Sequence, residues 1–492
     1  MSAKQTIGDL PDRVLLGNDK SLFEAGDYVL AVLNRALRAN DNPVIDAAIT
    51  QANTLDLPLI VYSELDETVA WASDRLFYFA LGAFRELAQS LIKRDIFCIQ
   101  QIRIKNSSDI LPVLISRAAV IYTDEEHTHW DKARLQRLLT LAEQTVFLID
   151  ASRLVPLRKL PEKLRTTPAF RKAHGALRED YIALRQQVLE SEFVCTLNNK
   201  EQNEGVQTAI EKSSHSFAGL DSTDSNFANY SDAALQLIVS QLNINHTIPI
   251  SAEHPPTSAE IEKRIHTLKA EILSRYKWIR NNPALEFSTS ELSPYLHFGM
   301  ISPHQLIAEI ENSDVPKTYT WKFRDEFLTW REWSHYQAFY NPDIHKFEGL
   351  SNSAQKTLNA HATDERPEQL TKEDIVQGRS PDTTWNAAQK EWLRTGWLHN
   401  NLRMYWAKQI LRFTPDPQTA WETACYINDY ISLDGRDPAT YASMQWAFGN
   451  AKPGYSEKEI YGWVAPKLDR AILKRKGMKE WIAKRNATSA SD

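Results

Sequence analysis

The sequence predicts an N-terminal α/β domain with a parallel sheet, followed by an all-helical domain. Helical patterns alternate with short β-rich runs between about residues 25 and 155, whereas helical periodicity dominates beyond residue 258. Between 198 and 258 the composition turns to Asn, Ser, Thr, Glu and Gln, which is typical of a linker. We therefore expect an α/β domain over 1–155, a partly disordered interdomain linker over 156–258 and a helical domain over 259–492.

The α/β prediction rests on four β-rich runs and the helical stretches between them. The runs are PLIVYS (58–63), DIFCIQQIRI (95–104), AAVIYT (118–123) and TVFLID (145–150), and the stretch 73–94 between the first two has helical periodicity. Strand, helix and strand at these spacings predict a parallel sheet, which binds ligands at the carboxyl ends of its strands. The sequence contains no glycine-rich phosphate loop, so the ligand of this domain stays open.

The bulk composition excludes several classes of protein. The 492 residues carry 57 Lys and Arg against 63 Asp and Glu, for a net charge of −6, so any DNA binding must come from a local patch. Cys98, Cys195 and Cys425 have no CxxC spacing, which argues against disulfides, a zinc site or a four-cysteine iron–sulfur cluster. No signal peptide and no membrane-length apolar run is present. We expect a cytoplasmic protein.

One predicted helix combines apolar and polar residues in an unusual way. The stretch TGWLHNNLRMYWAKQILRF (395–413) places Leu402 and Tyr405 among apolar neighbours at helical spacing, yet it also carries Arg403. An unpaired buried charge costs several kcal/mol or more, so something polar must meet this arginine inside the protein. Asp434, in NDYISLDGRDP (428–438), is a carboxylate able to pair with it. Packing alone is the simpler explanation for most of the 14 tryptophans.

Two further stretches carry groups that suit a binding site. In STSELSPYLHFG (288–299), Thr289, Ser290 and Ser293 offer hydroxyls where a helix begins, an arrangement suited to phosphate oxygens. Ordinary N-capping would also explain them. Glu326 lies one helical turn before Trp330, so a carboxylate and an indole share a face. A surface charge beside a core tryptophan is the alternative for that pair.

Together these stretches resemble the DNA photolyase and cryptochrome superfamily. The resemblance lies in TSxLSPYLHFG, TWNAAQKEWLRTGWLHNNLRMYWAK and YINDYISLDGRDP, in this order. NAAQ followed by RMYWAK, and LDGRDP, look like class II cyclobutane-pyrimidine-dimer photolyases in particular. The match is close over about 276–450, and over 25–155 it is architectural, through LRANDNPVIDAAI.

The resemblance implies the photolyase/cryptochrome fold, with a Rossmann-like antenna domain and an all-α C-terminal domain that holds FAD. It further implies an antenna chromophore, deazaflavin or folate, whose identity the sequence leaves open. Arg403 and Asp434 would pair beside the flavin ring, with Asn400 close by and Asn428 at N5. The full set of implied FAD-binding residues is Tyr276, Thr289, Ser290, Leu292, Ser293, Asn400, Arg403, Asn428 and Asp434.

The resemblance also implies an electron relay, and here the sequence departs from the family. Trp406 and Trp385 match the first two tryptophans of the class II relay, but the outer tryptophan corresponds to Phe413. Phenylalanine is far harder to oxidise, so the exit route is open. Trp392 and Trp397 are alternative outlets.

Four positions match those that contact the lesion in the family. Glu326 and Met404 fall where the dimer bases are contacted, and Trp330 and Trp446 where indoles flank the flipped dinucleotide. A second departure lies in GNAKPGYSEKE (449–459), which lacks the Asp-Arg-x-Trp type of loop that fills the emptied duplex. Tyr455 is the residue that can replace the missing wedge.

These implications lead to one main hypothesis and two alternatives. The main hypothesis is a monomeric deoxyribodipyrimidine photo-lyase that uses light and reduced FAD to split cyclobutane pyrimidine dimers in damaged DNA, with Glu326, Asn428, Trp406, Trp385 and Met404 as its catalytic residues and no metal. The first alternative is a cryptochrome-like blue-light photoreceptor that keeps FAD but does not repair DNA. The second is a helical scaffold that has lost its flavin.

Overall fold

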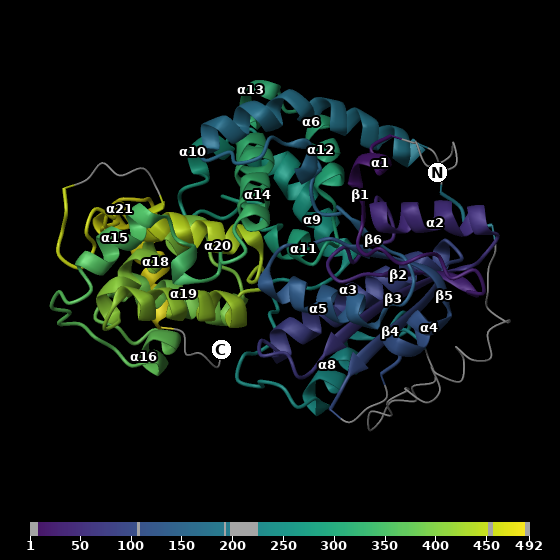
Figure 1. Cartoon of the computed structure of the whole chain (residues 1–492). Helices are drawn as coiled ribbons and strands as arrows, with labels where there is room; N and C mark the ends of the chain where they lie inside the picture. The colour runs from purple at the N-terminus through teal and green to yellow at the C-terminus, as the bar shows by residue number, and fades with distance from the viewer. Residues whose placement is uncertain (1–7, 106–108, 191–192, 197–224, 451–455, 488–492) are drawn as a thin grey trace.

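The computed structural model describes residues 8–105, 109–190, 193–196, 225–450 and 456–487. Its N-terminal part is built on a 6-stranded sheet in the order β1-β6-β5-β2-β3-β4 (Figure 1). The strands are β1 (Val14–Leu16), β2 (Tyr28–Val32), β3 (Leu59–Asp66), β4 (Phe97–Arg103), β5 (Ala118–Asp124) and β6 (Val146–Ile149). Every neighbouring pair is parallel except β1 and β6, which run antiparallel.

The predicted parallel sheet is confirmed, and the four predicted runs coincide with β3, β4, β5 and β6. The sequence analysis missed β1 and β2. Strand β2 is central and buried at all its positions, so its sequence YVLAV shows no alternation of polar and apolar residues. Strand β1 has only 3 residues, too few for any periodicity to appear.

Helices cover both faces of the sheet. α2 (Pro43–Leu55) and α3 (Asp74–Lys93) share one apolar cluster with the strands, and α4 (Leu111–Arg117) and α5 (His129–Leu141) share the cluster on the opposite face. α1 (Leu10–Arg13) precedes β1. The predicted helix at 73–94 is α3, which confirms that part of the prediction.

Helices also occupy part of the region predicted to be a linker. The 3₁₀ turn η2 (Leu157–Lys159) is followed by the long helix α6 (Thr167–Glu190), and α8 (Asp232–Gln241) packs against α3. The domain boundaries themselves stay a prediction, and residues 197–224 lie outside the described part of the chain.

The rest of the described chain is helical (Figure 1). Its first half contains α9 (Ser258–Thr267), η3 (Leu268–Ile272), α10 (Tyr276–Ile279), α11 (Ser293–His297), α12 (Pro303–Glu311), α13 (Lys317–Arg324), η4 (Asp325–Arg331) and α14 (Glu332–Tyr340). Its second half contains η5 (Phe347–Gly349), α15 (Asn352–Ala360), α16 (Lys372–Gln377), α17 (Thr383–Thr395), α18 (Asn400–Phe413), α19 (Pro417–Ile431), α20 (Pro438–Gln445), η6 (Trp446–Asn450), α21 (Arg470–Leu473) and α22 (Met478–Ala487). None of the helices in the described ranges has the length and apolar character needed to cross a bilayer.

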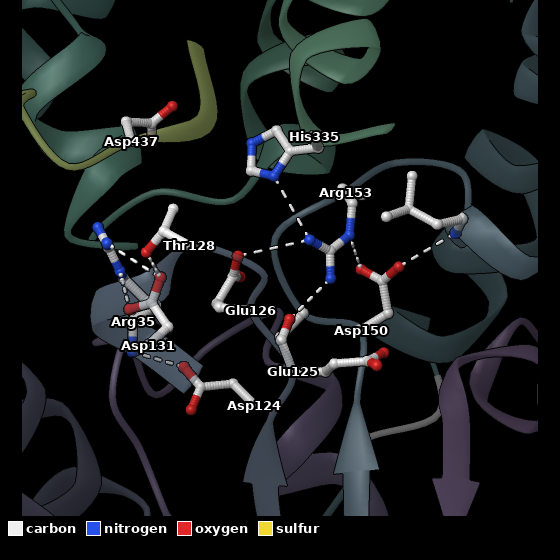
Figure 2. Close-up of polar contacts among 12 residues, drawn as sticks. Arg35, Asp124, Glu125, Glu126, Thr128, Asp131, Asp150, Arg153, His335 and Asp437 are labelled. Atoms are coloured by element: carbon white, nitrogen blue, oxygen red, sulfur yellow. Dashed lines mark hydrogen bonds and ion pairs between the residues drawn. The ribbon is translucent and has the colours of Figure 1, made fainter. Parts of the chain in front are cut away.

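The two parts share an apolar core and a buried charged layer. The ring of Phe79 on α3 lies 5.5 Å from that of Tyr295 and 4.8 Å from that of Phe298, so the core under the sheet continues into the helical part. Figure 2 shows the charged layer, where Arg153 donates from Nε to Asp150 at 2.7 Å and from Nη1 to His335 at 3.4 Å. These contacts hold the sheet against α14.

The predicted helix at 395–413 is interrupted, which corrects the sequence analysis. α17 ends at Thr395, Gly396 follows with φ of 73°, and α18 begins only at Asn400. Glycine adopts this left-handed conformation without a steric penalty, and a Cβ at position 396 would lie 2.8 Å from Cδ of Arg75. The glycine therefore ends one helix and makes room for an arginine of the other domain.

Arg75, on α3, links the two parts through backbone carbonyls. Its guanidinium donates to the carbonyls of Pro249 and Ile431 at 3.0 Å each, and to that of Leu393. Two of these carbonyls lie in the last turns of α17 and α19, where helices leave oxygens unpaired and favour a cation. Burial lowers the pKa of Arg75 to about 9.

We expect Arg75→Leu to lower the free energy of unfolding by more than about 3 kcal/mol, because the variant leaves several buried carbonyls without a donor. Urea unfolding followed by far-UV circular dichroism measures this loss. Arg117→Leu is the matched control, since Arg117 is 39% exposed and pairs with an equally exposed Asp27. The free energy of unfolding of Arg117→Leu should fall by no more than about 1 kcal/mol. Equal losses in the two variants would contradict a linking role for Arg75.

Candidate functional site

The centre of the helical part is a buried ion pair between Arg403 on α18 and Asp434 after α19. Nη2 of Arg403 lies 2.8 Å from Oδ1 of Asp434, and both side chains are less than 10% exposed. The hydroxyls of Ser293 and Ser432 each donate to the carboxylate at 2.6 Å. Burial by itself raises the pKa of Asp434, but the Arg403 charge and these hydrogen bonds hold it below its ordinary value. The predicted pair is confirmed.

Two tryptophans complete the walls around this pair. Nε1 of Trp392 donates to the hydroxyl of Ser432 at 3.0 Å, and Nε1 of Trp397 donates to that of Ser293 at 3.1 Å. The guanidinium of Arg403 lies 4.9 Å from the ring centroid of Trp392, within the range of a cation–π contact. The sequence analysis did not assign Ser432 or Trp392 to the binding site. Their contacts join residues that no local pattern connects.

Three buried polar atoms at this centre have no hydrogen-bond partner among the described residues: Nε of Arg403, Oδ1 of Asn428 and Nε2 of His399. Nδ2 of Asn428 donates to the carbonyl of Ala424 at 2.8 Å, which fixes the amide and leaves its oxygen free to accept. Burial lowers the pKa of His399 to about 4, so its ring is neutral at pH 7. Buried polar groups are normally satisfied, and these three would be satisfied by a polar ligand.

A cavity of about 740 Å³ lies beside this centre. Thr289 and Ser290 line it from the loop before α11, Trp397 and His399 from the segment before α18, and Arg264 from α9. Its volume lies within the range of cofactor pockets, and the hydroxyls of Thr289 and Ser290 suit phosphate oxygens. The lining also contains cations and glutamates, and Arg264 is paired with Glu260 and Glu291 at 3.0 Å each. A ligand of the size of FAD therefore fits the cavity, although Arg403, Asn428 and Asp434 are not among the residues that line it.

The N-capping alternative for the Ser/Thr stretch is wrong. α11 does begin at Ser293, as predicted, but its N-cap residue is Leu292, and no side chain caps the helix. Ser293 donates to Asp434 instead. Thr289 and Ser290 have no hydrogen bonds within the part of the chain that the structure describes, so their hydroxyls are available to a ligand.

The remaining predicted cofactor residues lie around this centre in different environments. Tyr276 is buried, with its ring edge-on to Phe323 at 5.1 Å. Leu292 is also buried, in the core shared with the sheet. Asn400 begins α18 and is exposed. Their contacts with a cofactor stay predictions.

The predicted relay residues are in contact. The rings of Trp406 and Trp385 stack with centroids 5.8 Å apart and an interplanar angle of 12°, and both are fully buried. Phe413 lies edge-on to Trp385 at 5.2 Å. Trp392 lies edge-on to Trp406, with the ring centroids 5.2 Å apart. Of the two alternative outlets, Trp392 and Trp397, it is the one whose ring contacts the Trp406–Trp385 pair in the described structure. It is fully buried and does not reach the surface.

The four predicted lesion contacts are spread over η4, α18 and η6. Glu326 is 26% exposed and lies 3.0 Å from Nη1 of Arg280 and 2.6 Å from Nζ of Lys322. Met404 is 9% exposed. Trp446 is 44% exposed, with Nζ of Lys408 5.3 Å from its ring.

Trp330 differs from the other three lesion positions. It is partly buried in the apolar cluster that contains Val155 and Tyr336, between the two domains. Trp330 lies on η4, which packs against α20, and Trp446 lies on η6, which directly follows α20. No ring contact joins the two indoles in the described structure. Tyr455, the predicted wedge, lies outside the described residues.

A second, smaller cavity lies at the carboxyl ends of the parallel strands, where a ligand of the α/β domain was expected. Its volume is about 30 Å³, and Trp71, Trp130, Arg134 and Arg436 are among its lining residues. The guanidinium of Arg436 lies 4.4 Å from the Trp71 ring and fills the space between the domains. A deazaflavin or a folate does not fit this cavity.

The fold is that of photolyases and cryptochromes. The chain superposes on a class III photolyase from Agrobacterium tumefaciens with a TM-score of 0.62 and 17% identity, over 95% of this chain and 88% of that one. It superposes on a Synechocystis cryptochrome with a TM-score of 0.64 and 16% identity, over 94% and 90%. For an archaeal photolyase from Sulfolobus tokodaii the TM-score is 0.58, with 15% identity over 94% and 92%.

Sequence comparison leads to the same family, although no family model matches the chain. The chain is 27% identical to the deoxyribodipyrimidine photo-lyase of Methanothermobacter thermautotrophicus over 93% of this chain and 94% of the relative. It is 37% identical to that of Potorous tridactylus, over 45% and 42%, and 36% identical to that of Oryza sativa, over 39% and 38%. These last two matches span less than half of each relative. In sequence the chain is similar to deoxyribodipyrimidine photo-lyases, and its fold is the one shared by photolyases and cryptochromes.

We expect Arg403→Leu to lower the free energy of unfolding by about 3 to 5 kcal/mol at pH 7, because Asp434 is left as a buried unpaired charge. A carboxylate whose pKa is held low stabilises the fold above its unfolded pKa and stops doing so as pH falls through its folded pKa. In the variant Asp434 can protonate without losing a partner, so the difference from wild type should shrink as pH falls from 7 toward 4.

Urea unfolding at a series of pH values measures both effects. Arg412→Leu is the control, because Arg412 is 34% exposed and pairs with a partly exposed Glu368. Arg412→Leu should lower the free energy of unfolding by less than about 1 kcal/mol at any pH. A loss for Arg403→Leu that does not change with pH would mean that the cost comes from packing and not from charge.

Proposed function

We propose that the helical part binds FAD and that the protein is a deoxyribodipyrimidine photo-lyase. The observation that carries the proposal is the set of unpaired buried atoms on Arg403, Asn428 and His399 beside the Arg403–Asp434 pair and the 740 Å³ cavity. The names and coverage of the curated relatives support the same assignment.

In this proposal the residues divide into two groups. Thr289 and Ser290 hold the phosphate side of the cofactor with their hydroxyls and backbone amides. Ser293, whose hydroxyl is used by Asp434 and Trp397, contributes its backbone amide. Arg403, Asp434 and Asn428 face the flavin ring. When bound, reduced FAD supplies light absorption and the electron that splits the dimer. The fixed charge of Arg403 stabilises negative charge developing beside it, and the buried setting strengthens that interaction.

We infer that the substrate is a cyclobutane pyrimidine dimer flipped out of damaged DNA. Glu326 lies between two cations on the surface of η4, where a carboxylate can accept hydrogen bonds from base N–H groups. Trp446 offers an exposed indole for stacking, and Met404 lies on α18 next to Arg403. Trp330 would have to turn out of its cluster to reach the same bases.

A cryptochrome-like photoreceptor is the second candidate, and one contact favours it. The relay from Trp406 to Trp385 meets Phe413, which cannot carry the electron vacancy to the surface. The positive charge of Arg403 beside Trp392 makes oxidation of that indole less favourable as well. A light-driven electron transfer that stays in the protein interior suits a photoreceptor. The curated relatives, all named as photo-lyases, oppose this candidate.

Three further expectations belong to the proposal. We expect a monomer. None of the three cysteines forms a disulfide within the described residues, which suits a reducing cytoplasm. An antenna chromophore is expected from the family, but its identity is open and its place is not the strand-end cavity of about 30 Å³.

The relay can be tested through light-driven reduction of bound FAD. Trp406→Phe should slow this reduction by at least about tenfold while the flavin content stays near one per chain, because a phenyl ring still fills most of the indole's place but is far harder to oxidise. Trp421→Phe, at a buried tryptophan outside the relay, is the control. Phe413→Trp should speed the reduction. If Phe413→Trp changes nothing, another aromatic already serves as the outlet.

Repair can be tested on a single-stranded oligonucleotide that carries one thymine dimer. Glu326→Ala should lower the yield of splitting by about tenfold with a smaller effect on binding, because it removes a hydrogen bond to the reacting bases. Trp446→Ala should do the reverse and weaken binding by about 1 to 3 kcal/mol, whereas Trp446→Phe keeps the stacking surface. Glu348→Ala, at an exposed glutamate of the same domain, should change neither.

The decisive comparison uses wild-type protein with fully reduced FAD under blue light. Measurable repair supports the photo-lyase proposal. If thymine dimers in single-stranded oligonucleotides stay intact while the protein binds flavin, the photo-lyase proposal fails and the photoreceptor takes its place.

A further inference from the structure

Three large aromatic side chains are exposed close together on α10 and α13, which pack against each other (Figure 1). Trp278 is 61% exposed, Trp321 47% and Tyr319 42%. With Lys277 and Lys322 they form what we name the aromatic–lysine surface. Large aromatic side chains are usually buried, so three exposed together mark a site of interaction.

The aromatic rings and the lysines alternate in space. Nζ of Lys277 lies 5.8 Å from the Trp278 centroid and 5.7 Å from the Trp321 centroid, so this ammonium stands between two indoles. Nζ of Lys322 lies 5.8 Å from the centroid of the Trp321 ring. The Trp278 and Tyr319 rings are 6.0 Å apart. Lys277 makes no ion pair within the described ranges, so its charge is available to an anion.

Packing within the chain does not account for these aromatics. α10 has only 4 residues and buries Tyr276, whose ring contacts Phe323 of α13 at 5.1 Å. That contact fixes the two helices together. Trp278, Tyr319 and Trp321 instead lie on the solvent side of the same helices, where they do not contribute to the core clusters.

The aromatic–lysine surface is continuous with the proposed lesion site. Lys322 contacts both Trp321 and Glu326, with its Nζ 2.6 Å from the carboxylate of Glu326. Arg280, one helical turn after Tyr276, contacts the same carboxylate at 3.0 Å. A DNA strand whose bases reach Glu326 would therefore leave the site over Lys322, Trp321 and Trp278.

We propose that the aromatic–lysine surface binds unpaired DNA next to the lesion, with bases stacked on Trp278, Tyr319 and Trp321 and a phosphate on Lys277, while Lys322 stays paired with Asp325 and Glu326. Surfaces that bind single strands combine aromatic rings with cations in this way, and stacking tolerates any base. The direction of the strand rests on the proposed function, but the binding of single-stranded DNA does not. The surface would compensate for the altered 449–459 loop by holding the strand outside the duplex.

The test measures binding of an undamaged, fluorescein-labelled 20-nucleotide oligo(dT) in the dark by fluorescence anisotropy. The double variant Trp278→Ala/Trp321→Ala should bind at least about 30-fold more weakly than wild type, because two stacked bases are lost. Phe23→Ala, at a 43% exposed aromatic of the α/β domain, is the matched control and should bind as wild type does. An unchanged dissociation constant in the double variant would overturn the proposal, as would an equal loss in the control.

The electrostatic part has its own measurement. Lys277→Gln should reduce the slope of log affinity against log salt by about 0.7 for a single strand, because one phosphate contact is lost. Lys93→Gln, at an exposed lysine of α3, should leave the slope unchanged. Equal slopes for wild type and Lys277→Gln would contradict a phosphate contact.

Splitting of a thymine-dimer dinucleotide separates this proposal from the proposed function. The dinucleotide is too short to reach the aromatic–lysine surface, so the double variant should split it as wild type does. If wild type fails to split it but still binds oligo(dT) through Trp278 and Trp321, the proposed function fails and the surface stands. If the double variant instead abolishes self-association of the protein without changing DNA binding, the surface is a contact between copies and the proposal is overturned.

Discussion

The buried pair between Arg403 and Asp434 is the interaction on which the helical part depends. Taking both charges out of water is costly, and the cost is recovered only if the partners stay together and the remaining lone pairs are satisfied. Ser293 and Ser432 supply the missing hydrogen bonds to the carboxylate. Three separate stretches of the chain therefore have to meet at one point: the start of α11, the first turn of α18 and the loop after α19.

The aromatic residues around the pair follow from the same requirement. The two serine hydroxyls that donate to Asp434 accept from Trp392 and Trp397, so each hydroxyl is used in both directions. Arg403 keeps its Nε free and Asn428 keeps its oxygen free, although both lie in a region where almost every other polar atom is paired. The hydrogen bonds of the Asp434 carboxylate are complete, whereas Nε of Arg403 and Oδ1 of Asn428 stay unpaired and can bind a polar ligand.

The two domains meet through charge as well as through apolar contacts. Glu125 and Glu126 follow β5 directly, and Arg153 lies among them and His335 of the helical part (Figure 2). Burial raises the pKa of Glu126 to about 7 despite the Arg153 charge. This layer, together with Arg436 over Trp71, occupies the strand ends that parallel sheets usually offer to ligands. The α/β domain here uses that edge to dock against its neighbour.

The sequence by itself determined the parallel sheet and the helical second domain, because both depend on periodic patterns. It also pointed to Asp434 as a partner for Arg403, and the family resemblance pointed to Trp406 and Trp385, but their stacking is seen only in the structure. It did not determine where the helix at 395–413 begins, since the left-handed Gly396 is required by contact with Arg75 of the other domain. It also did not reveal β2, whose uniform burial removes the alternation that would have predicted a strand. Ser432, the free atoms of Arg403 and Asn428, and the exposed rings of α10 and α13 were decided by the tertiary structure alone. Hydrogen bonds and exposure depend on which distant segments meet, and no local pattern in the chain records that.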